Sequence, residues 1–474
     1  MPASQLATRA KTPPGNGARR GLPEALTLAA MSLGYGVVQL DVTIVNVAAN
    51  SIGASFGGQV AGLQWVVSSY TIAFAAFILS AGALGDRVGA KRVFAAGFAV
   101  FTLASLACAL APSLPWLIAA RSVQGLGAAI LVPNSLALLN HAYRDEHARG
   151  RAVGTWAAGA SIALTAGPLV GGSLIALFGW RSIFLVNLPL GAAGLWLAWR
   201  YAKDTPPRRD RALDLIGQLL AVVALGALAA ALIEGGEKGW ASVWVLAGGA
   251  VAVAAVAGFV AREALAGGPM LPLGLFKSAE FSATTAAGLL VNIAFYGLIF
   301  VLSLYFQRAQ HLSPIWTGLA FVPITGACFA ANLAAARVAH RLGVRAAIAI
   351  GGVAVAVSCA SLVWIDQATA YAWLAAPCMV MGAGLGLLVP PLTSALLGSV
   401  DKQRSGLASG VLNAARQTGS VLGVALMGSL LAAGVVVGAR TSLALAAALM
   451  AAATAVVWFS LKPAPARKRL RGAA

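Results

Sequence analysis

The sequence has few charged residues for its length. Asp, Glu, Lys and Arg together make up 10% of the 474 residues, whereas soluble globular proteins carry about 25%. Hydrophobic residues make up 59%. A chain this long and this poor in charge cannot keep most of its surface in water. The composition therefore argues against a large soluble core and indicates a protein that is mostly embedded in lipid.

Acidic residues and cysteines are scarce as well. Asp and Glu number 14 against 33 Lys and Arg, which gives a formal net charge of +19. The basic residues stand in short segments between apolar runs and form no basic soluble domain, so the charge does not predict nucleic-acid binding. The 4 cysteines lie inside apolar runs without a CxxC pair. They are expected to pack as small apolar residues, and no metal site is predicted.

Common catalytic motifs are missing from the sequence. It contains no GxxxxGK[ST] phosphate loop, no HExxH pair and no GxSxG turn. We therefore expect no ATP hydrolysis, no enzyme activity and no cofactor. A membrane enzyme stays open as the less favoured alternative.

Long apolar runs are what the sequence does contain. A membrane-spanning helix needs about 20 apolar residues, and continuous runs predict helices because barrel strands alternate. The first run is too long for a signal peptide, so it is predicted to be a retained helix. The fourteen predicted spans are 25–49, 61–85, 91–111, 114–140, 150–177, 180–200, 213–233, 240–261, 281–306, 314–338, 343–364, 371–397, 405–432 and 437–461.

The distribution of Lys and Arg predicts the orientation of these spans. Cytoplasmic loops of membrane proteins are enriched in both residues. With the amino terminus in the cytoplasm, the basic loops near 87–92, 144–151, 203–211, 337–345 and 402–404 all fall inside. An even number of spans returns the carboxyl terminus to the same side. The sequence thus predicts a multi-pass protein of the inner (plasma) membrane with both termini cytoplasmic.

The chain contains an internal repeat. The segment GLGAAILVP at 125–133 matches GAGLGLLVP at 382–390, and glycines of the following spans match at nearly the same offset. Two parallel six-helix repeats are typical of transporters that bind substrate between the halves. The predicted units are a cytoplasmic basic tail (1–24), a six-helix bundle (25–200), a linker with two inserted helices (201–265), a second six-helix bundle (266–461) and a basic tail (462–474).

The loop between the second and third spans carries a recognisable motif. The segment GALGDRVGAKR resembles the cytoplasmic loop motif of the major facilitator superfamily, in which it acts in gating. Its matching residues are Gly82, Asp86, Arg87, Gly89, Lys91 and Arg92. Glycine permits the tight turn, and the basic residues keep the loop cytoplasmic. An ordinary basic loop is the alternative interpretation.

The fourth span places an arginine in an apolar run. The segment LIAARSVQGLGAA resembles the fourth-helix motif of the same superfamily through Arg121, Gln124, Gly125 and Gly127. A buried arginine is costly, and it normally pairs with an acid or faces a cavity. Proton relay and a purely structural ion pair are both open for Arg121.

The fifth span is rich in small residues. The segment GTWAAGASIALTAGPLVGG resembles the antiporter motif of the superfamily, which marks exporters. Its matching residues are Gly154, Gly167, Pro168, Gly171 and Gly172. Glycine lets helices approach closely and proline removes a backbone donor. Generic close packing is the alternative.

The first span carries a single acid. Asp41 stands in VVQLDVTIVNVAAN, and a carboxyl group among apolar side chains is suited to taking up and releasing protons. The segment resembles the first-helix motif of the fourteen-helix drug:proton antiporters (EmrB/QacA-type), and LIEGGEKGW at 232–240 resembles their methylenomycin-resistance branch. We predict that Asp41, with Arg121, couples proton movement to transport. A structural partnership of Asp41 with Arg121 is the alternative.

These resemblances imply an all-α integral membrane protein with the major facilitator fold and 14 transmembrane helices (6 + 2 + 6). They imply a monomeric, proton-driven exporter of amphiphilic or cationic drugs or antibiotics that works by alternating access. An importer or uniporter of a small metabolite is the alternative. Polar and aromatic residues of the spans, each equally able to bridge helices, form the tentative substrate cavity: Asn46, Trp65, Tyr70, Asn134, Asn292, Tyr296, Asn413 and Arg416.

Overall fold

The computed structural model describes residues 17–143, 145–207, 214–267, 269–401 and 404–461. The predicted tails, 1–24 in its first 16 residues and 462–474 throughout, lie outside the described residues. Every element in the described part is helical, which confirms the predicted fold class. Thirteen helical segments within it are long and apolar enough to cross a membrane.

The first half of the chain forms one helical bundle. Its helices are α1 (Gly17–Phe56), α2 (Val60–Val88), α3 (Ala90–Ala109), α4 (Leu114–Ala142), α5 (Glu146–Phe178), α6 (Ser182–Leu185) and α7 (Asn187–Tyr201). The predicted span 180–200 is thus two helices, which meet at Val186. α8 (Leu215–Lys238) and α9 (Val243–Leu265) follow as an inserted pair that packs together.

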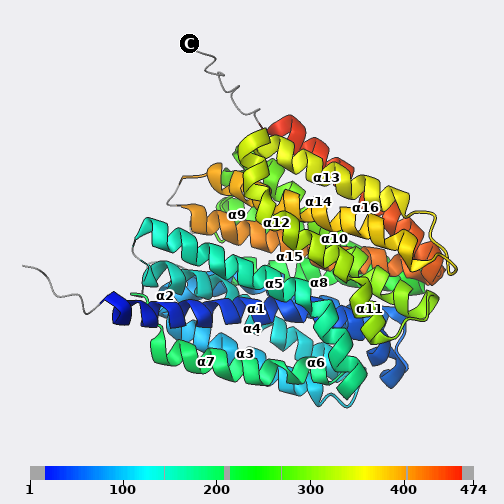
Figure 1. Cartoon of the computed structure of the whole chain (residues 1–474), viewed down its shortest axis with the longest axis horizontal. Helices are drawn as coiled ribbons and strands as arrows, with labels where there is room; N and C mark the ends of the chain where they lie inside the picture. The colour runs from blue at the N-terminus through cyan, green and yellow to red at the C-terminus, as the bar shows by residue number, and fades with distance from the viewer. Residues whose placement is uncertain (1–16, 144, 208–213, 268, 402–403, 462–474) are drawn as a thin grey trace, which may run out of the picture.

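The second half repeats this arrangement. Its elements are η1 (Leu273–Lys277), α10 (Ala279–Leu304), η2 (Tyr305–Ala309), α11 (Pro314–Ala320), α12 (Val322–Leu342), α13 (Val344–Ser361), α14 (Tyr371–Gly398), α15 (Ser405–Ser429), η4 (Leu430–Ala433) and α16 (Val435–Ser460). The predicted span 314–338 is interrupted at Phe321. In Figure 1 the first half occupies the lower part of the molecule and the second half the upper part.

α15 corresponds to the predicted span 405–432. It is not among the thirteen most apolar segments because Asn413, Arg416 and Gln417 lower the hydropathy of its middle. The helix nevertheless packs along α10 and α2, at the boundary between the two halves. Its polar residues therefore face protein in part, which is where polar groups in a membrane helix are tolerated.

The two halves repeat individual contacts as well as helices. A Cβ atom at Gly125 of α4 would lie 2.2 Å from the carbonyl oxygen of Tyr70 in α2. At the matching place in the second half, a Cβ at Gly382 of α14 would lie 1.9 Å from the carbonyl oxygen of Ile324 in α12. Both glycines thus allow one helix backbone to touch another. The sequence repeat corresponds to a repeat of helix packing.

Hydrogen bonds between the halves gather at one end of the molecule. Gln64, near the start of α2, donates to the carbonyls of Val424 and Ala425 near the end of α15, at 3.0 and 2.8 Å. Ser303 donates to the carbonyl of Asn46 at 2.8 Å. Gln307 and Arg308 donate to Val47 and Asn50 of α1. These bonds lie at the end where α1 leads into α2. Toward the other end of α2, Ser80 donates to Sδ of Met270 at 3.3 Å.

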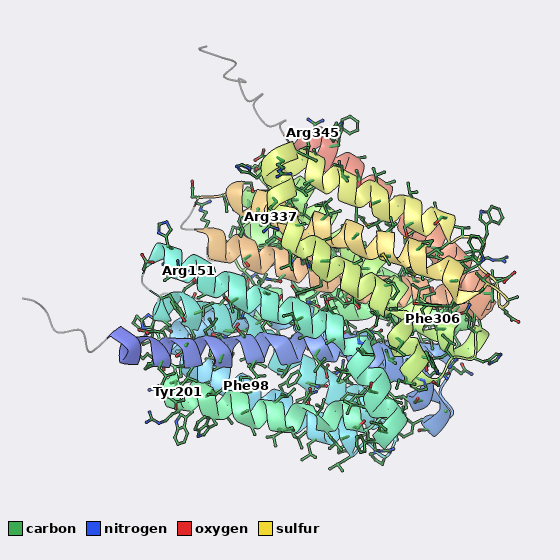
Figure 2. The ribbon with its side chains drawn as sticks, viewed as in Figure 1. Phe98, Arg151, Tyr201, Phe306, Arg337 and Arg345 are labelled. Carbon is green, nitrogen blue, oxygen red and sulfur yellow. The ribbon has the colours of Figure 1, made fainter. Side chains whose placement is uncertain are left out.

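The opposite end of the molecule carries basic residues. Figure 2 shows Arg151, Arg337 and Arg345 toward the end where α1 begins, and Phe306 toward the other end. Arg151 lies near the start of α5, Arg337 near the end of α12 and Arg345 near the start of α13. Most of the hydrogen bonds between the halves therefore lie at the end away from these arginines.

Candidate functional site

A buried ion pair lies inside the first half. The Nη1 atom of Arg121 in α4 is 2.5 Å from Oδ2 of Asp41 in α1. The side chain of Arg121 is 1% exposed and that of Asp41 is 0% exposed. The structure therefore brings together the two charged residues that the sequence singled out, although 80 residues separate them. An ion pair in a membrane interior avoids the cost of two isolated charges.

Neutral side chains complete the hydrogen bonds of this pair. Gln124 donates to Oδ1 of Asp41 at 2.8 Å and accepts from Arg121 at 2.6 Å. Asn187 of α7 donates to the same Oδ1 at 3.2 Å. Both amides also donate to the hydroxyl of Ser105 in α3. We call Asp41, Ser105, Arg121, Gln124 and Asn187 the ion-pair network. Four helices of the first half contribute to it.

An aromatic residue covers the ion-pair network on the side of α2. The guanidinium carbon of Arg121 lies 4.2 Å from the centre of the Tyr70 ring. Arg121 also donates to the carbonyl oxygen of Val66 in α2 at 3.1 Å. Arg121 thus has three partners besides Asp41: the Tyr70 ring, the carbonyl of Val66 and the amide oxygen of Gln124. These interactions satisfy its guanidinium in addition to the ion pair.

The antiporter motif in α5 packs against α1. Pro168 has no backbone N–H, so the carbonyl oxygen of Leu164 lacks its usual helix partner. The hydroxyl of Thr43 in α1 donates to that oxygen at 3.1 Å. A Cβ atom at Gly167 would lie 1.9 Å from the same hydroxyl oxygen. Glycine and proline thus create a contact that only this pair of residues allows.

The same motif continues into the contact between the halves. A Cβ at Gly172 would lie 2.4 Å from the carbonyl oxygen of Pro314 in α11. In return, a Cβ at Gly318 of α11 would lie 2.5 Å from the carbonyl oxygen of Pro168. Gly171 contacts Ile44 of α1. Gly154 differs, because a Cβ there would meet nothing within 4 Å. Close packing therefore explains four of the five matched residues.

The loop between α2 and α3 is a tight turn held by a residue outside the motif. Gly89 has a φ of 111°, which favours glycine. The Oδ1 atom of Asp204, after α7, accepts a hydrogen bond from the backbone N–H of Lys91 at 3.0 Å. Arg92 lies 3.6 Å from the same carboxylate. Asp204 thus caps the start of α3, and nothing local in the sequence indicates this because the two segments are distant.

Other motif residues occupy supporting positions. Gly82 packs near Pro133. Arg87 is exposed and Asp86 is half-buried at the end of α2. Gly127 lets α4 contact the backbone of Phe101 in α3.

A second arginine lies between the halves. Arg416 of α15 donates to the hydroxyl of Thr393 in α14 at 2.7 Å. Tyr35 of α1 and Tyr296 of α10 lie within electrostatic range of its guanidinium. In the part of the chain that the structure describes, it forms no ion pair with a carboxylate. We call Tyr35, Tyr296, Thr393 and Arg416 the inter-half cluster, which includes two of the predicted cavity residues.

The remaining predicted cavity residues do not join this cluster. Asn134 is buried within the first half and donates to the carbonyl of Ala81 in α2 at 3.1 Å. Trp65 faces the inserted pair, where its Nε1–H donates to Glu234 at 3.3 Å. The ring of Tyr70 covers Arg121 of the ion-pair network. The amides of Asn46, Asn292 and Asn413 donate to carbonyls of their own helices.

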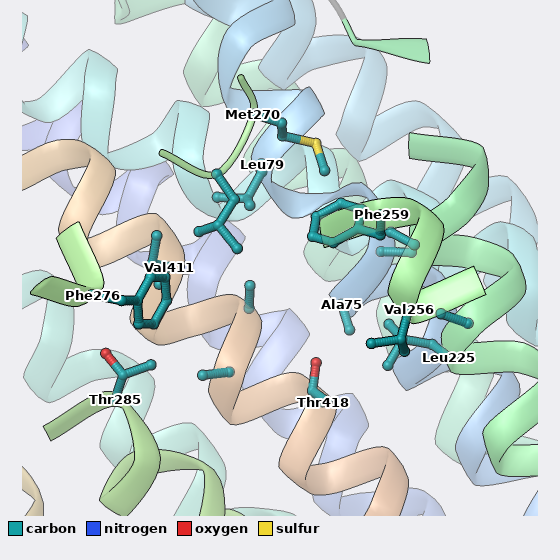
Figure 3. A pocket seen from close by; sticks show the side chains of 16 residues that line it. Ala75, Leu79, Leu225, Val256, Phe259, Met270, Phe276, Thr285, Val411 and Thr418 are labelled. Atoms are coloured by element: carbon teal, nitrogen blue, oxygen red, sulfur yellow. The ribbon is translucent and has the colours of Figure 1, made fainter. Parts of the chain in front are cut away.

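An apolar pocket that was not predicted from the sequence lies beside the inserted helices. Its volume is about 260 Å³, and side chains of α2, α8, α9 and α15 line it together with Met270 and Phe276. Figure 3 shows Phe259 and Val256 on one side and Val411 and Thr418 on the other. No charged residue lines it. Arg416 points elsewhere, since it lies roughly 160° around α15 from Thr418.

Comparisons with known proteins agree with these features. Residues 31–424 match the family described as the Major Facilitator Superfamily. The chain is 40% identical to a methylenomycin A resistance protein of Streptomyces coelicolor over 88% of this chain and 87% of that protein. It is 39% identical to the methylenomycin A resistance protein of Bacillus subtilis, over 92% of this chain and 94% of that one.

Two further proteins are similar to this chain, one in sequence and one in fold. A multidrug resistance protein of Mycobacterium tuberculosis is 39% identical over 86% of this chain and 76% of its own length. The crystal structure of a human organic anion transporter superposes with a TM-score of 0.64 at 16% identity, over 92% of this chain and 99% of that one. The predicted resemblance to the methylenomycin-resistance branch is confirmed. The chain belongs to the major facilitator superfamily.

Proposed function

We propose that this protein exports drugs or antibiotics in exchange for protons. The observation that carries the proposal is its identity of 39–40% with methylenomycin A resistance proteins over nearly the whole chain. The glycine contacts of α5 with α1 and α11 support it, because they lie in the antiporter motif. The proton gradient supplies the energy, and no cofactor is needed. One chain holds both the ion-pair network and the inter-half cluster, so a monomer suffices.

Asp41 carries the proton in this proposal. In its charged state it accepts from Arg121, Gln124 and Asn187. Proton uptake at Oδ2 replaces the ion pair by a neutral carboxyl group beside a guanidinium. That weakens the link between α1 and α4 while Arg121 keeps its other partners. Because α1 also packs on α10 across the boundary, a small movement of α1 reaches the contact between the halves.

The protein alternates between inward-open and outward-open states. The hydrogen bonds between the halves at the end of α1 and α10 correspond to closure on the outer side. This assignment follows from the basic end being cytoplasmic. Outward opening must break these bonds and separate Gly172 from α11.

An export assay tests the proposal. The chain is expressed in a bacterial host without its main drug exporters, and the inhibitory concentrations of methylenomycin A and of a drug panel are measured. We expect resistance to at least one compound, lost when an uncoupler collapses the proton gradient. Increased accumulation of a compound would support the importer alternative instead. Resistance that survives the uncoupler would contradict proton coupling.

A reporter fusion tests the orientation. A reporter that is active only in the periplasm is fused after Ala474, with a fusion after Gly434, in the turn before α16, as the positive control. Both termini are cytoplasmic in this proposal, so activity is expected only from the second fusion. Activity at Ala474 would contradict the orientation.

A further inference from the structure

Among the residues that the structure describes, Arg416 has no carboxylate partner, and it lies at the boundary of the two halves. It lies midway along α15 and keeps partial exposure, whereas Arg121 is buried against Asp41. Its hydrogen bond goes to a neutral hydroxyl, that of Thr393. A guanidinium held away from bulk water without an acid is costly. A half-buried guanidinium of this kind is free to accept an anionic partner from outside the chain.

The neighbours of Arg416 are aromatic. Tyr35 and Tyr296 both lie within electrostatic range of its guanidinium. Tyr35 stacks on Trp156 of α5, with ring centres 4.3 Å apart and ring planes inclined by 20°. Tyr296 is adjacent to Phe295, whose ring centre is 5.0 Å away. Flat apolar surfaces therefore lie beside a single positive charge.

The chemistry of the inter-half cluster favours a ligand that carries a carboxylate. A guanidinium presents N–H groups in a planar fork that fits both oxygens of a carboxylate. The hydroxyls of Tyr35 and Tyr296 can donate further hydrogen bonds. An ammonium or other cation placed here would meet the like charge of Arg416. The one acid buried in the first half offers no compensation, because Asp41 is already paired and enclosed.

The position of the cluster suits transported cargo. Tyr35 comes from α1 and Trp156 from α5, while Tyr296, Thr393 and Arg416 come from α10, α14 and α15. A ligand held by all five side chains would contact both halves, and such contacts change when the halves move. Ligands of two-repeat transporters bind between their repeats.

We propose that Arg416 recognises the anionic group of the cargo, so that the substrates are small organic carboxylates with an apolar, preferably flat, body. This rests on the proposed function and replaces a cationic substrate by an acidic one. Arg416 acts on the carboxylate, and Tyr35, Trp156 and Tyr296 contact the apolar body.

A binding experiment tests this proposal without requiring transport. Quenching of tryptophan fluorescence is measured in purified protein in lipid nanodiscs. The probes are benzoate, 1-naphthoate and decanoate, each compared with its uncharged primary amide, and 1-naphthylmethylammonium as the cation. We expect at least one carboxylate to bind roughly 10- to 100-fold more tightly than its amide, since a charged hydrogen-bonded pair is replaced by a neutral one.

Variants separate the guanidinium from its surroundings. Arg416→Gln should remove the preference for the carboxylate and leave amide binding unchanged, while Arg416→Lys should keep part of the preference. Arg440→Gln is the matched control, because Arg440 donates to the carbonyl of Ile365 in a loop. The melting temperature of each variant establishes that it is folded.

The outcomes distinguish this inference from the proposed function. Equal binding of every carboxylate and its amide, a preference for the ammonium, or an unchanged preference in Arg416→Gln would overturn the inference. Proton-coupled export of a cation with no carboxylate binding would retain the proposed function alone. Carboxylate binding that depends on Arg416, without any proton-coupled export, would retain the inference alone.

Discussion

Arg121 and Arg416 both lie inside the helical part of the protein, but they differ in burial and in their partners. Arg121 is enclosed in the first half, paired with Asp41 and bonded to Gln124. Arg416 lies at the boundary of the second half with a hydroxyl as its hydrogen-bond partner. At the repeat offsets the positions that match them hold Cys378 and Ala160. The halves share helix packing but not these charged residues. In this account the first half binds the proton at Asp41, and the second half binds the cargo at Arg416.

Removing the arginine charges should give the largest contrast. Arg121→Met leaves Asp41 buried without its cation, and breaking a buried pair costs about 3–5 kcal/mol. Arg416→Met removes a charge that has no acidic partner, so stability should be unchanged or higher. Melting temperatures of the purified proteins measure both effects. Equal destabilisation by the two substitutions would remove the distinction between the arginines.

Blocking the closure between the halves should stop transport while leaving both arginine regions intact. Gly172→Leu places a side chain where the carbonyl of Pro314 lies. Gly154→Leu is the matched control, because it adds the same side chain where nothing lies within 4 Å. Resistance should be lost in the first variant and retained in the second, with equal amounts in the membrane. Full resistance of Gly172→Leu would contradict the closure.

Introducing an acidic residue beside Arg416 should give it a carboxylate partner within the chain, as Arg121 has in Asp41. Tyr296→Glu places a carboxylate beside the guanidinium, and a neutral pair forms. The variant should fold with a melting temperature no lower than that of the natural protein, and it should lose carboxylate binding. Tyr296→Gln is the uncharged control. It also loses the ring contact, so it should bind more weakly than the natural protein but still prefer the carboxylate to its amide. Undiminished binding of 1-naphthoate by Tyr296→Glu would show that Arg416 does not recognise the anion.

The smallest effect is expected at the edge of the ion-pair network. Ser105→Ala removes an acceptor for Gln124 and Asn187, and a lost buried hydrogen bond costs about 1–3 kcal/mol. The melting temperature should fall moderately, and proton-coupled export should persist. A complete loss of coupling would place Ser105 in the proton path.

The sequence predicted the spans, the repeat and several charged residues because each has a local signal. Asp41 and Arg121 stand out in apolar runs, and their pairing was one of two open interpretations. Partners distant in the chain could not be predicted. Asp204 caps α3 from beyond α7, and Thr43 satisfies the carbonyl freed by Pro168. Tyr35 and Thr393 have no local signal, since a tyrosine or threonine in a span usually packs against neighbouring helices.

The solvent exposure of a side chain could not be predicted from its position along a helix either. Glu234 lies near the end of α8, where a charged side chain is usually exposed to solvent. Its side chain is 27% exposed, pairs with Lys238 and accepts from Trp65. Trp65 accordingly lies toward the inserted helices. Helix packing, which the sequence does not specify, decides which of these residues reach the boundary of the halves.

Proton movement driven by cargo tests the central claim most directly. Vesicles containing the natural protein or Asp41→Asn are given an imposed pH gradient, and the exported compound is then added while internal pH and compound uptake are recorded. Asn keeps the size of Asp41 and much of its hydrogen bonding but cannot release a proton. The account predicts that the natural protein concentrates the compound and dissipates the gradient, and that Asp41→Asn binds the compound but does neither. Concentration of the compound by Asp41→Asn in response to the gradient would contradict it, and the ion pair would then be structural.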